Sequence, residues 1–187
     1  MAGGVGFTLT VAAWIVLELG QRVRERLHGR GGTGRDRATR ILIGVSIGAA
    51  VALAALTAAH VQSLRVSASV RAAGVVVMWL GLAIRGWAIA TLGSAFRTTV
   101  EVDAGQAVVS TGPYAWVRHP SYTGLLLIVT GFGLAAGNWI GAAICLVAPL
   151  PAVVRRIAVE EAELTRVLGD PYRRYAARTK RLVPGLW

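Results

Sequence analysis

SYTGLLLIVTGFGLAAGNWIGAAICLVAPLPAVV, residues 121–154, is a long apolar stretch without a charged side chain. The turn signal AAGN, residues 135–138, divides it into two runs, 121–136 and 139–154. A bilayer-spanning helix takes about 20 apolar residues, so these two short runs predict a helical hairpin. Pro149 and Pro151 predict a kink in the second run, because proline removes a backbone donor and clashes with the preceding turn. In a membrane such freed carbonyls lie against protein or a cavity, so the kink points to a pocket.

Three further apolar runs precede the hairpin, at about 4–20, 40–61 and 70–92. Hydrophobic residues make up 55% of the 187 residues, above the roughly 45–50% of soluble domains. We therefore predict an all-α, polytopic integral membrane protein with about five transmembrane helices and a cytoplasmic C-terminal helix. It would form a single domain, with two N-terminal spans in 1–69 and a catalytic core in 70–187. The first run lacks a preceding basic region, so we expect a retained span rather than a secretory signal.

Basic residues dominate the charge, with 20 Lys and Arg against 9 Asp and Glu and a net charge of +11. They lie between the apolar runs, which predicts contact with membrane lipids and not with nucleic acid. The densest basic segments are 21–40 and the chain after 154, whereas 62–69 holds only Arg65. The positive-inside rule then predicts an N-terminus outside and a C-terminus in the cytoplasm. Segments 93–120 and 155–187 would meet on the cytoplasmic side, where we expect the chemistry.

GPYAWVRHPSYTG, residues 112–124, stands where the polar segment 93–120 meets the fourth apolar run. Proline is favoured at the first position of a helix, so Pro120 is predicted to start this span. Arg118 and His119 would then precede a helix N-terminus, which attracts anions. The alternative is that Arg118 anchors to lipid phosphate and His119 only caps the helix. The residues alone leave both interpretations open.

VVRRIAVEEAELTRVLG, residues 153–169, places Glu160 and Glu161 on the helix between Ile157 and Leu164, where a continuous apolar face would carry leucines. Neighbouring helical residues diverge by about 100°, so the two glutamates are predicted to do different jobs. One would reach a ligand while the other braces the loop or an arginine. The alternative is an ordinary surface helix with pairs such as Arg156–Glu160.

Arg85 lies inside the third run, seven residues before its end at Leu92. An ionisable residue in a span is a functional hypothesis by default, and snorkelling to the interface is the competing account. The tail GDPYRRYAARTKRLVPGLW, residues 169–187, mixes Tyr172 and Tyr175 with basic residues. It predicts headgroup contact or a lid over an anionic ligand. The sequence has no His/Cys cluster and no nucleophile elbow, so we expect neither a metal site nor a serine hydrolase.

Four pieces of the sequence together resemble the isoprenylcysteine carboxyl methyltransferase family, which is also similar to membrane phospholipid N-methyltransferases. The pieces are RGWAIATLG (85–93), GPYAWVRHPSYTG (112–124), the glutamate pair (160–161) and GDPYRRYAARTKRLVPG (169–185). The resemblance covers about the last hundred residues and implies that S-adenosylmethionine binds at the cytoplasmic face. It implies a cofactor site made by six residues, which are His119, Tyr122, Gly124, Glu160, Glu161 and Tyr175, and leaves open which of the two glutamates touches the cofactor.

The resemblance implies methyl transfer to a lipophilic or prenylated acceptor that enters from the bilayer. For a carboxylate acceptor, we expect Arg118 or Arg85 to orient the carboxylate as the catalytic arginine. The alternatives are N-methylation of a phospholipid or small amine, and an NADPH-dependent membrane reductase of the sterol or steroid type. The composition, rich in Arg, Ala and Gly, predicts a bacterial inner membrane. These residues do not distinguish methylation of a carboxylate from methylation of an amine.

Overall fold

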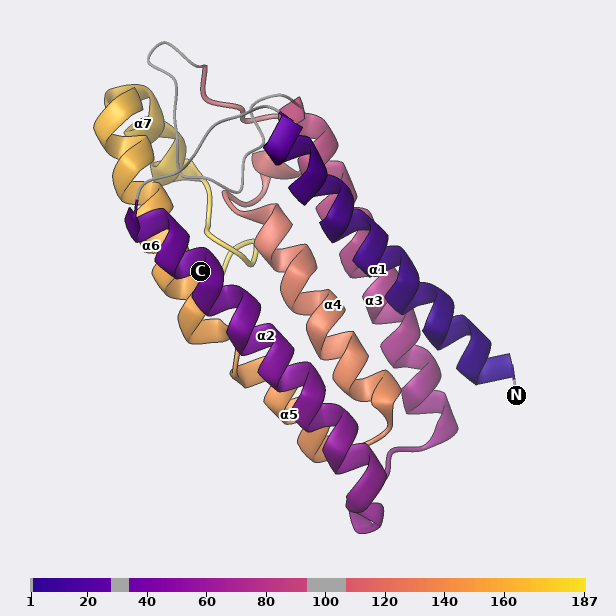
Figure 1. Ribbon diagram of the computed structural model, residues 1–187. Coiled ribbons are helices and arrows are strands. Elements are labelled where there is room, and N and C mark those ends of the chain that lie inside the picture. Colours follow the sequence, from indigo (N-terminus) through magenta and orange to yellow (C-terminus); the bar gives the residue numbers. More distant parts are fainter. Residues whose placement is uncertain (1, 28–33, 94–106) are drawn as a thin grey trace.

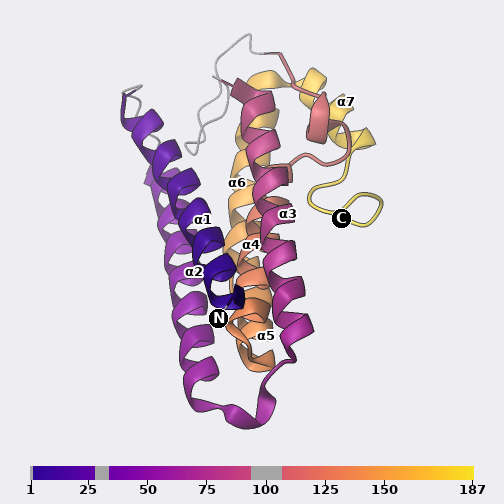
Figure 2. The same ribbon diagram turned by 90° about the vertical axis from the view of Figure 1, so that its right-hand side faces the viewer.

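The computed structural model of the chain describes residues 2–27, 34–93 and 107–187, and the regular structure in these ranges is helical. Figures 1 and 2 show α1 to α6 running roughly along one axis, with α7 at the end of the bundle where α3 and α6 end. The N-terminus lies toward the opposite end. The helices are α1 Ala2–Leu27, α2 Gly34–His60, α3 Ala68–Leu92, α4 Pro120–Ala136, α5 Trp139–Val147, α6 Leu150–Leu168 and α7 Asp170–Arg178, with short 3₁₀ turns η1 Gln62–Leu64 and η3 Gly112–Ala115.

Every apolar run predicted from the sequence is helical, which confirms the all-α membrane fold. Four helical segments in the described chain are long and apolar enough to cross a bilayer: 4–23, 37–60, 68–92 and 139–168. The last of these joins α5 and α6. The remaining run, α4, is apolar but has only 17 residues, fewer than the roughly 20 that a helix needs to cross the hydrocarbon core without tilt or thinning. The number of full spans therefore stays a prediction.

The hairpin of α4 and α5 and the kink after it follow from a few local residues. Gly137, at a φ of 98°, ends α4, a conformation that glycine adopts without a steric penalty. The Asn138 side chain then caps α5 by accepting a hydrogen bond from the backbone N–H of Ile140 at 2.9 Å. The helix breaks between Val147 and Leu150, where Pro149 precedes α6. The predicted hairpin and kink are both confirmed.

A close contact of α3 with α4 fixes the start of α4 in space. A Cβ atom added at Gly124 would lie 2.6 Å from the carbonyl oxygen of Gly81, so the two backbones approach within a distance that only glycine allows. Met78 and Ile128, both fully buried, continue this contact into the core. Since Arg118 and His119 directly precede α4, their positions are tied to α3 by this packing.

Large apolar side chains cover the outside of the bundle. Val16, Val76 and Trp79 are 69%, 64% and 51% exposed. In water such a surface would be unfavourable, whereas hydrocarbon tails solvate it. The polar and charged side chains discussed below lie instead inside the bundle or at its α7 end.

Candidate functional site

The stretch around Arg118 and His119 is held by the C-terminal tail. The backbone N–H of Arg118 donates to the carbonyl of Lys180 at 2.7 Å, and that of His119 donates to the carbonyl of Arg181 at 3.0 Å. Pro120 is the first residue of α4, as predicted. His119 occupies the N-cap position, but its side chain makes no capping hydrogen bond. The histidine side chain is therefore available for contacts with α6.

Glu161 lies between two arginines that come from other parts of the chain. Arg118 Nε donates to Oε1 of Glu161 at 2.8 Å, and Arg181 Nε donates to Oε2 at 2.9 Å. The His119 Nε2 atom lies 3.3 Å from Oε1 of the same carboxylate. Glu161 thus joins α6 to the start of α4 and to the tail through charge-assisted hydrogen bonds.

Glu160 points to a different set of partners, because it is one residue along the helix. The hydroxyl of Tyr122 donates to Oε1 of Glu160 at 2.6 Å, and Arg156 Nε donates to the same oxygen at 2.9 Å. Oε2 lies 3.5 Å from Nδ1 of His119. Arg156 is 1% exposed and also donates to Oγ1 of Thr39 in α2 at 2.9 Å. The prediction that the two glutamates do different jobs agrees with this geometry.

We call these residues the arginine–glutamate cluster; its members are Arg118, His119, Tyr122, Arg156, Glu160, Glu161 and Arg181. Three arginines face two glutamates, and His119 lies between both carboxylates. Burial by itself lowers the pKa of His119, but its hydrogen bonds to Glu160 and Glu161 outweigh burial and raise the pKa above the usual 6.5. The cluster is therefore a buried cationic region built around two carboxylates.

Arg118 directs all of its observed side-chain contacts toward the chain itself. Besides Glu161, its Nη1 atom donates to the carbonyl of Ala176 at 2.8 Å and to the carbonyl of Thr179. These contacts connect the start of α4 to the end of α7. The lipid-anchor alternative is not supported, because the Arg118 side chain is only 10% exposed.

Arg85, the other arginine expected in catalysis, does not join the cluster. Its Nε and Nη2 atoms donate to the two oxygens of Glu18 in α1 at 2.8 and 3.0 Å, and its Nη1 atom donates to Oγ of Ser121 at 2.7 Å. The Arg85 side chain is 6% exposed, so it does not snorkel to the interface. It is instead part of a partly buried ion pair between helices, next to the first turn of α4.

Gly124 and Tyr175, both expected at the cofactor pocket, lie in different surroundings. Gly124 packs against Gly81 and Arg85 in the α3–α4 contact. Packing alone therefore accounts for this glycine, and its cofactor contact stays a prediction. Tyr175 donates its hydroxyl to the carbonyl of Tyr114 at 2.7 Å, and burial raises its pKa to about 12. It is a neutral hydrogen-bonding group at neutral pH.

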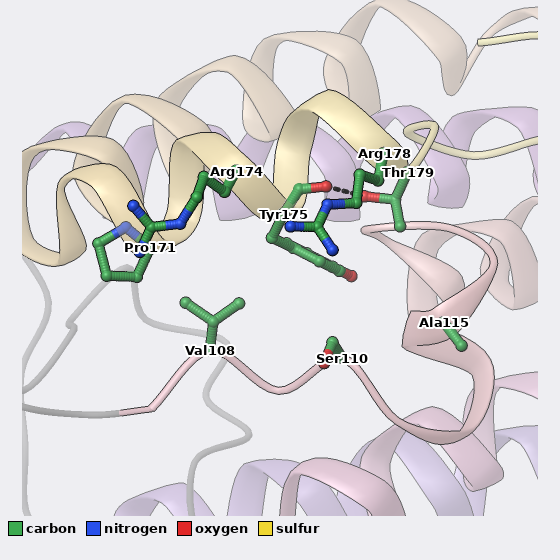
Figure 3. A pocket seen from close by; sticks show the side chains of 8 residues that line it. All are labelled: Val108, Ser110, Ala115, Pro171, Arg174, Tyr175, Arg178 and Thr179. Atoms are coloured by element: carbon green, nitrogen blue, oxygen red, sulfur yellow. Dashed lines mark hydrogen bonds between the residues drawn. The ribbon is translucent and has the colours of Figure 1, made fainter.

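A cavity of about 400 Å³ lies between α7 and the segment before α4. Figure 3 shows side chains of α7 facing Val108 and Ser110 across this space. Its lining residues are Val108, Ser110, Ala115, Pro171, Arg174, Tyr175, Arg178 and Thr179. The cavity adjoins the arginine–glutamate cluster, because the Thr179 carbonyl accepts a hydrogen bond from Arg118.

One buried polar atom near the cavity lacks a partner. The hydroxyl of Tyr172 in α7 is buried and makes no hydrogen bond within the described residues. Its ring lies 6.0 Å from that of Tyr175. Burial and then the negative charge of Glu161 raise the pKa of Tyr172, so this hydroxyl stays protonated at neutral pH. An unpaired buried hydroxyl costs free energy and is satisfied by a ligand or water.

Several members of the site were not singled out from the sequence. Arg181 belongs to the tail motif but was grouped with its other basic residues, and Arg156 was considered only as a surface partner of Glu160. The sequence did contain a signal for Glu18. Glu18 is the only charged residue in 4–20, and Arg85 is the only charged residue in 72–96. Two opposite charges that each stand alone in a span predict an ion pair between spans. Thr39 and Ser121 carried no comparable signal.

A profile of the Isoprenylcysteine carboxyl methyltransferase (ICMT) family matches residues 73–166, half of the chain. The chain is 30% identical over 107 residues to the protein-S-isoprenylcysteine O-methyltransferase of Schizosaccharomyces pombe, covering 50% of this chain and 45% of the relative. It is 32% identical over 113 residues to the protein-S-isoprenylcysteine O-methyltransferase B of Arabidopsis thaliana, covering 59% of this chain and 57% of the relative. The chain thus spans about half the length of these curated relatives.

A solved structure is also similar to this fold. It is described as the eukaryotic intramembrane Ras methyltransferase ICMT. The two share 30% sequence identity with a TM-score of 0.59, and the match covers 63% of this chain and 43% of that one. Because the family profile begins at residue 73, α1 and α2 lie outside the region it matches.

Proposed function

Because this integral membrane protein belongs to the isoprenylcysteine carboxyl methyltransferase family, we propose that it transfers a methyl group from S-adenosylmethionine to a lipophilic carboxylate at the membrane surface. The observation that carries this proposal is the arrangement of Glu160, Glu161 and His119 beside a cavity lined by two arginines at one end of an apolar helical bundle. A water-soluble cofactor and a membrane-bound acceptor would approach such a site from opposite sides.

The residues present fit S-adenosylmethionine by size and chemistry. The cavity volume of about 400 Å³ lies within the usual range for small-molecule sites. Arg174 and Arg178 line the cavity and suit the carboxylate of the cofactor. The unpaired Tyr172 hydroxyl supplies a buried donor nearby. We propose that His119, Tyr122, Glu160, Glu161 and Tyr175 hold the cofactor between the cavity and the cluster.

When bound, S-adenosylmethionine supplies an electrophilic methyl group on a sulfonium. The chain's own contribution is orientation and exclusion of water. An acceptor carboxylate is ionised at neutral pH, since its reference pKa is about 4, so no residue has to act as a general base. Arg118 is bound by Glu161, Ala176 and Thr179, which supports a role in positioning the site rather than in gripping the acceptor. Arg85 stays the proposed partner of the acceptor carboxylate, which would have to replace Glu18 on the guanidinium, because Glu18 and Ser121 occupy its donors in this structure.

The carboxylate acceptor is favoured over an amine because the curated relatives are named for O-methylation of isoprenylcysteine. A sterol-type reductase would bind NADPH, and neither the family match nor these relatives point to one. The acceptor class is testable by its chemistry: a methyl ester releases methanol in alkali, whereas an N-methyl group is stable.

Calorimetry of the purified protein in detergent tests the cofactor. We expect S-adenosylhomocysteine to bind, and Tyr122→Phe to weaken that binding. Membranes that contain the protein should then transfer label from methyl-labelled cofactor to a lipid-soluble, alkali-labile product. Absence of S-adenosylhomocysteine binding would overturn the methyltransferase proposal. An alkali-stable product would show that the acceptor is an amine and not a carboxylate.

We further propose that the α7 end of the bundle faces the cytoplasm of a bacterial cell, with the N-terminus outside. The basic residues Arg37, Arg40, Arg174 and Arg178 lie near this end, as the positive-inside rule requires. Single cysteines in a Cys145→Ala background test the orientation. An impermeant thiol reagent should label Ser63→Cys, beside α2 and α3, in intact cells and Arg173→Cys only after permeabilisation. The reverse pattern would overturn it.

A further inference from the structure

The first helix carries a polar stripe on the face that points into the bundle. Thr10, Trp14, Glu18 and Gln21 are spaced four, four and three residues apart, which places them on one face of α1. Thr10 is fully buried and Gln21 is 8% exposed. The lipid-facing side of the same helix is apolar, as the exposure of Val16 shows. The two ends of the stripe are therefore buried, while Trp14 and Glu18 between them are partly exposed.

Two members of this stripe lack hydrogen-bond partners. The side-chain nitrogen and oxygen of Gln21 and the Nε1 atom of Trp14 are buried and make no hydrogen bond within the described parts of the chain. Thr10 and Glu18 are satisfied, by the Gly6 carbonyl and by Arg85. In a membrane helix, unpaired amide and indole groups cost free energy unless a ligand or water pairs with them. Polar residues in spans are therefore functional candidates.

The ion pair of Glu18 with Arg85 shows where the stripe lies. Arg85 is in α3 and also bonds Ser121 in the first turn of α4, so the stripe faces the region between α1, α3 and α4. Gln21 is about one turn from Glu18 toward the α7 end, and Trp14 is about one turn away in the other direction. Apolar contacts flank the stripe: Phe7 packs on Phe132 with ring centroids 5.3 Å apart.

The chemistry of the unpaired groups defines a ligand class. A carboxamide offers one acceptor and two N–H donors, and an indole N–H offers one more donor. Arg85 has Nε, Nη1 and Nη2 engaged by Glu18 and Ser121, and the ion pair is neutral as a whole. The open groups of Gln21 and Trp14 therefore complement a neutral group in the ligand head that has both a carbonyl and an N–H.

We propose that this face of α1 binds a lipophilic molecule through an amide in its head. The Gln21 carboxamide pairs reciprocally with the amide C=O and N–H, Trp14 donates to the carbonyl, and the apolar tail lies among the helices. α1 lies outside the residues that match the family profile, so the site is a property of this chain rather than of the matched region. The amide belongs either to the methyl acceptor or to an amide-linked membrane lipid.

A matched pair of probes tests the site on the full chain in phosphatidylcholine nanodiscs without cofactor. Radiolabelled N-dodecylacetamide carries the amide, and dodecyl acetate is its ester isostere without the N–H. After subtraction of partition into empty discs, we expect the amide to bind at least tenfold more tightly than the ester. A site built to pair with an N–H discriminates strongly against an analogue that lacks it. Equal affinities would overturn the proposal.

Variants of α1 separate specific binding from general partition. Gln21→Leu should lower affinity for the amide at least tenfold and affinity for the ester by less, because the ester shares only the carbonyl contact, so the two probes should then bind about equally. Trp14→Phe should weaken amide binding in the same direction. Leu19→Met on the lipid-facing side is the control and should bind like the wild type. Gln21→Leu removes an unpaired buried amide, so the empty protein should melt at the same or a higher temperature. A retained amide preference in Gln21→Leu would refute the site.

Competition then identifies the source of the amide. If N-dodecylacetamide inhibits methyl transfer competitively against a lipophilic carboxylate, the site belongs to the acceptor. If it binds and turnover is unchanged, the occupant is an amide-linked lipid. The binding measurement requires neither cofactor nor turnover, so a failure of the proposed methyl transfer and a failure of this site are distinguishable.

Discussion

The Nε atom of Arg118 lies 2.8 Å from Oε1 of Glu161, although 43 residues separate them in sequence. This pair brings together the segment before α4 and the glutamate pair of α6. Arg181 binds the other oxygen of the same carboxylate, so three distant parts of the chain meet at one side chain. A mutation of Glu161 therefore tests both the contribution of the cluster to the stability of the fold and its role in cofactor binding.

Glu161→Gln removes the negative charge and keeps the shape. We expect S-adenosylhomocysteine binding to weaken at least tenfold, because Arg118 and Arg181 lose their shared anion and His119 loses one acceptor. The free energy of unfolding should fall by about 1–3 kcal/mol. Glu163→Gln is the matched control, since Glu163 lies two residues after Glu161 on the same helix and pairs with the exposed Arg166. Equal effects of the two substitutions on calorimetric binding would contradict the site.

Arg156→Met tests the buried arginine that holds Glu160. Removal of the guanidinium leaves Glu160 and Thr39 without this donor in a buried location, so we expect the free energy of unfolding to fall by about 3–5 kcal/mol. The neighbouring Arg155 is exposed, and Arg155→Met should change stability by no more than about 0.5 kcal/mol. Denaturant unfolding in detergent measures both. Similar stabilities of the two variants would show that Arg156 does not support the cluster.

The helices were predictable from the sequence because apolar runs and turn residues are local signals. The 121–154 stretch with its AAGN turn and Pro149 predicted the hairpin and the kink, and both are present. The different directions of Glu160 and Glu161 followed from helix geometry alone. The helix ends were less predictable: α1 continues to Leu27 and α2 begins at Gly34, both beyond the apolar runs that predicted them.

Apart from the local Arg156–Glu160 pair, the partners within the arginine–glutamate cluster were not predictable, because pairing between distant segments depends on tertiary packing. Arg118 was expected at the acceptor or the headgroups, yet it binds Glu161 and two carbonyls of the α7 region. Gly124 was expected at the cofactor, yet its missing Cβ is required by the carbonyl of Gly81. Both positions are explained only when the α3–α4 contact and the returning tail are known.

Gly124→Ala tests the close approach of α3 and α4. The new Cβ would lie 2.6 Å from the Gly81 carbonyl oxygen, so the helices have to separate. We expect a loss of about 1–3 kcal/mol in unfolding free energy, typical of overpacking. Gly86→Ala in α3 has open space around the added Cβ and should be neutral or stabilise the helix by about 0.5–1 kcal/mol. Melting temperatures in one detergent compare the two. An equal loss in Gly86→Ala would contradict the packing interpretation.

Arg85→Met separates a structural from a catalytic role of the partly buried pair with Glu18. The single variant should lose both stability and turnover, since Glu18 is left unpaired, while affinity for S-adenosylhomocysteine is largely kept. The double variant Glu18→Leu/Arg85→Met should recover stability but not turnover. Turnover that recovers together with stability would show that Arg85 only holds the helices.

The protonation of His119 predicts how stability depends on pH. Hydrogen bonds to Glu160 and Glu161 raise its pKa above the 6.5 of a free histidine, so the folded state binds this proton more tightly than the unfolded state. The resulting stabilisation is fully present below pH 6.5 and is lost as the pH rises through the pKa of the folded protein. His119→Gln should therefore show a flatter decline in unfolding free energy between about pH 6 and about pH 9 than the wild type. His60→Gln, an exposed position, should keep the wild-type profile. A wild-type stability that instead increases across this range would show that burial outweighs the two carboxylates.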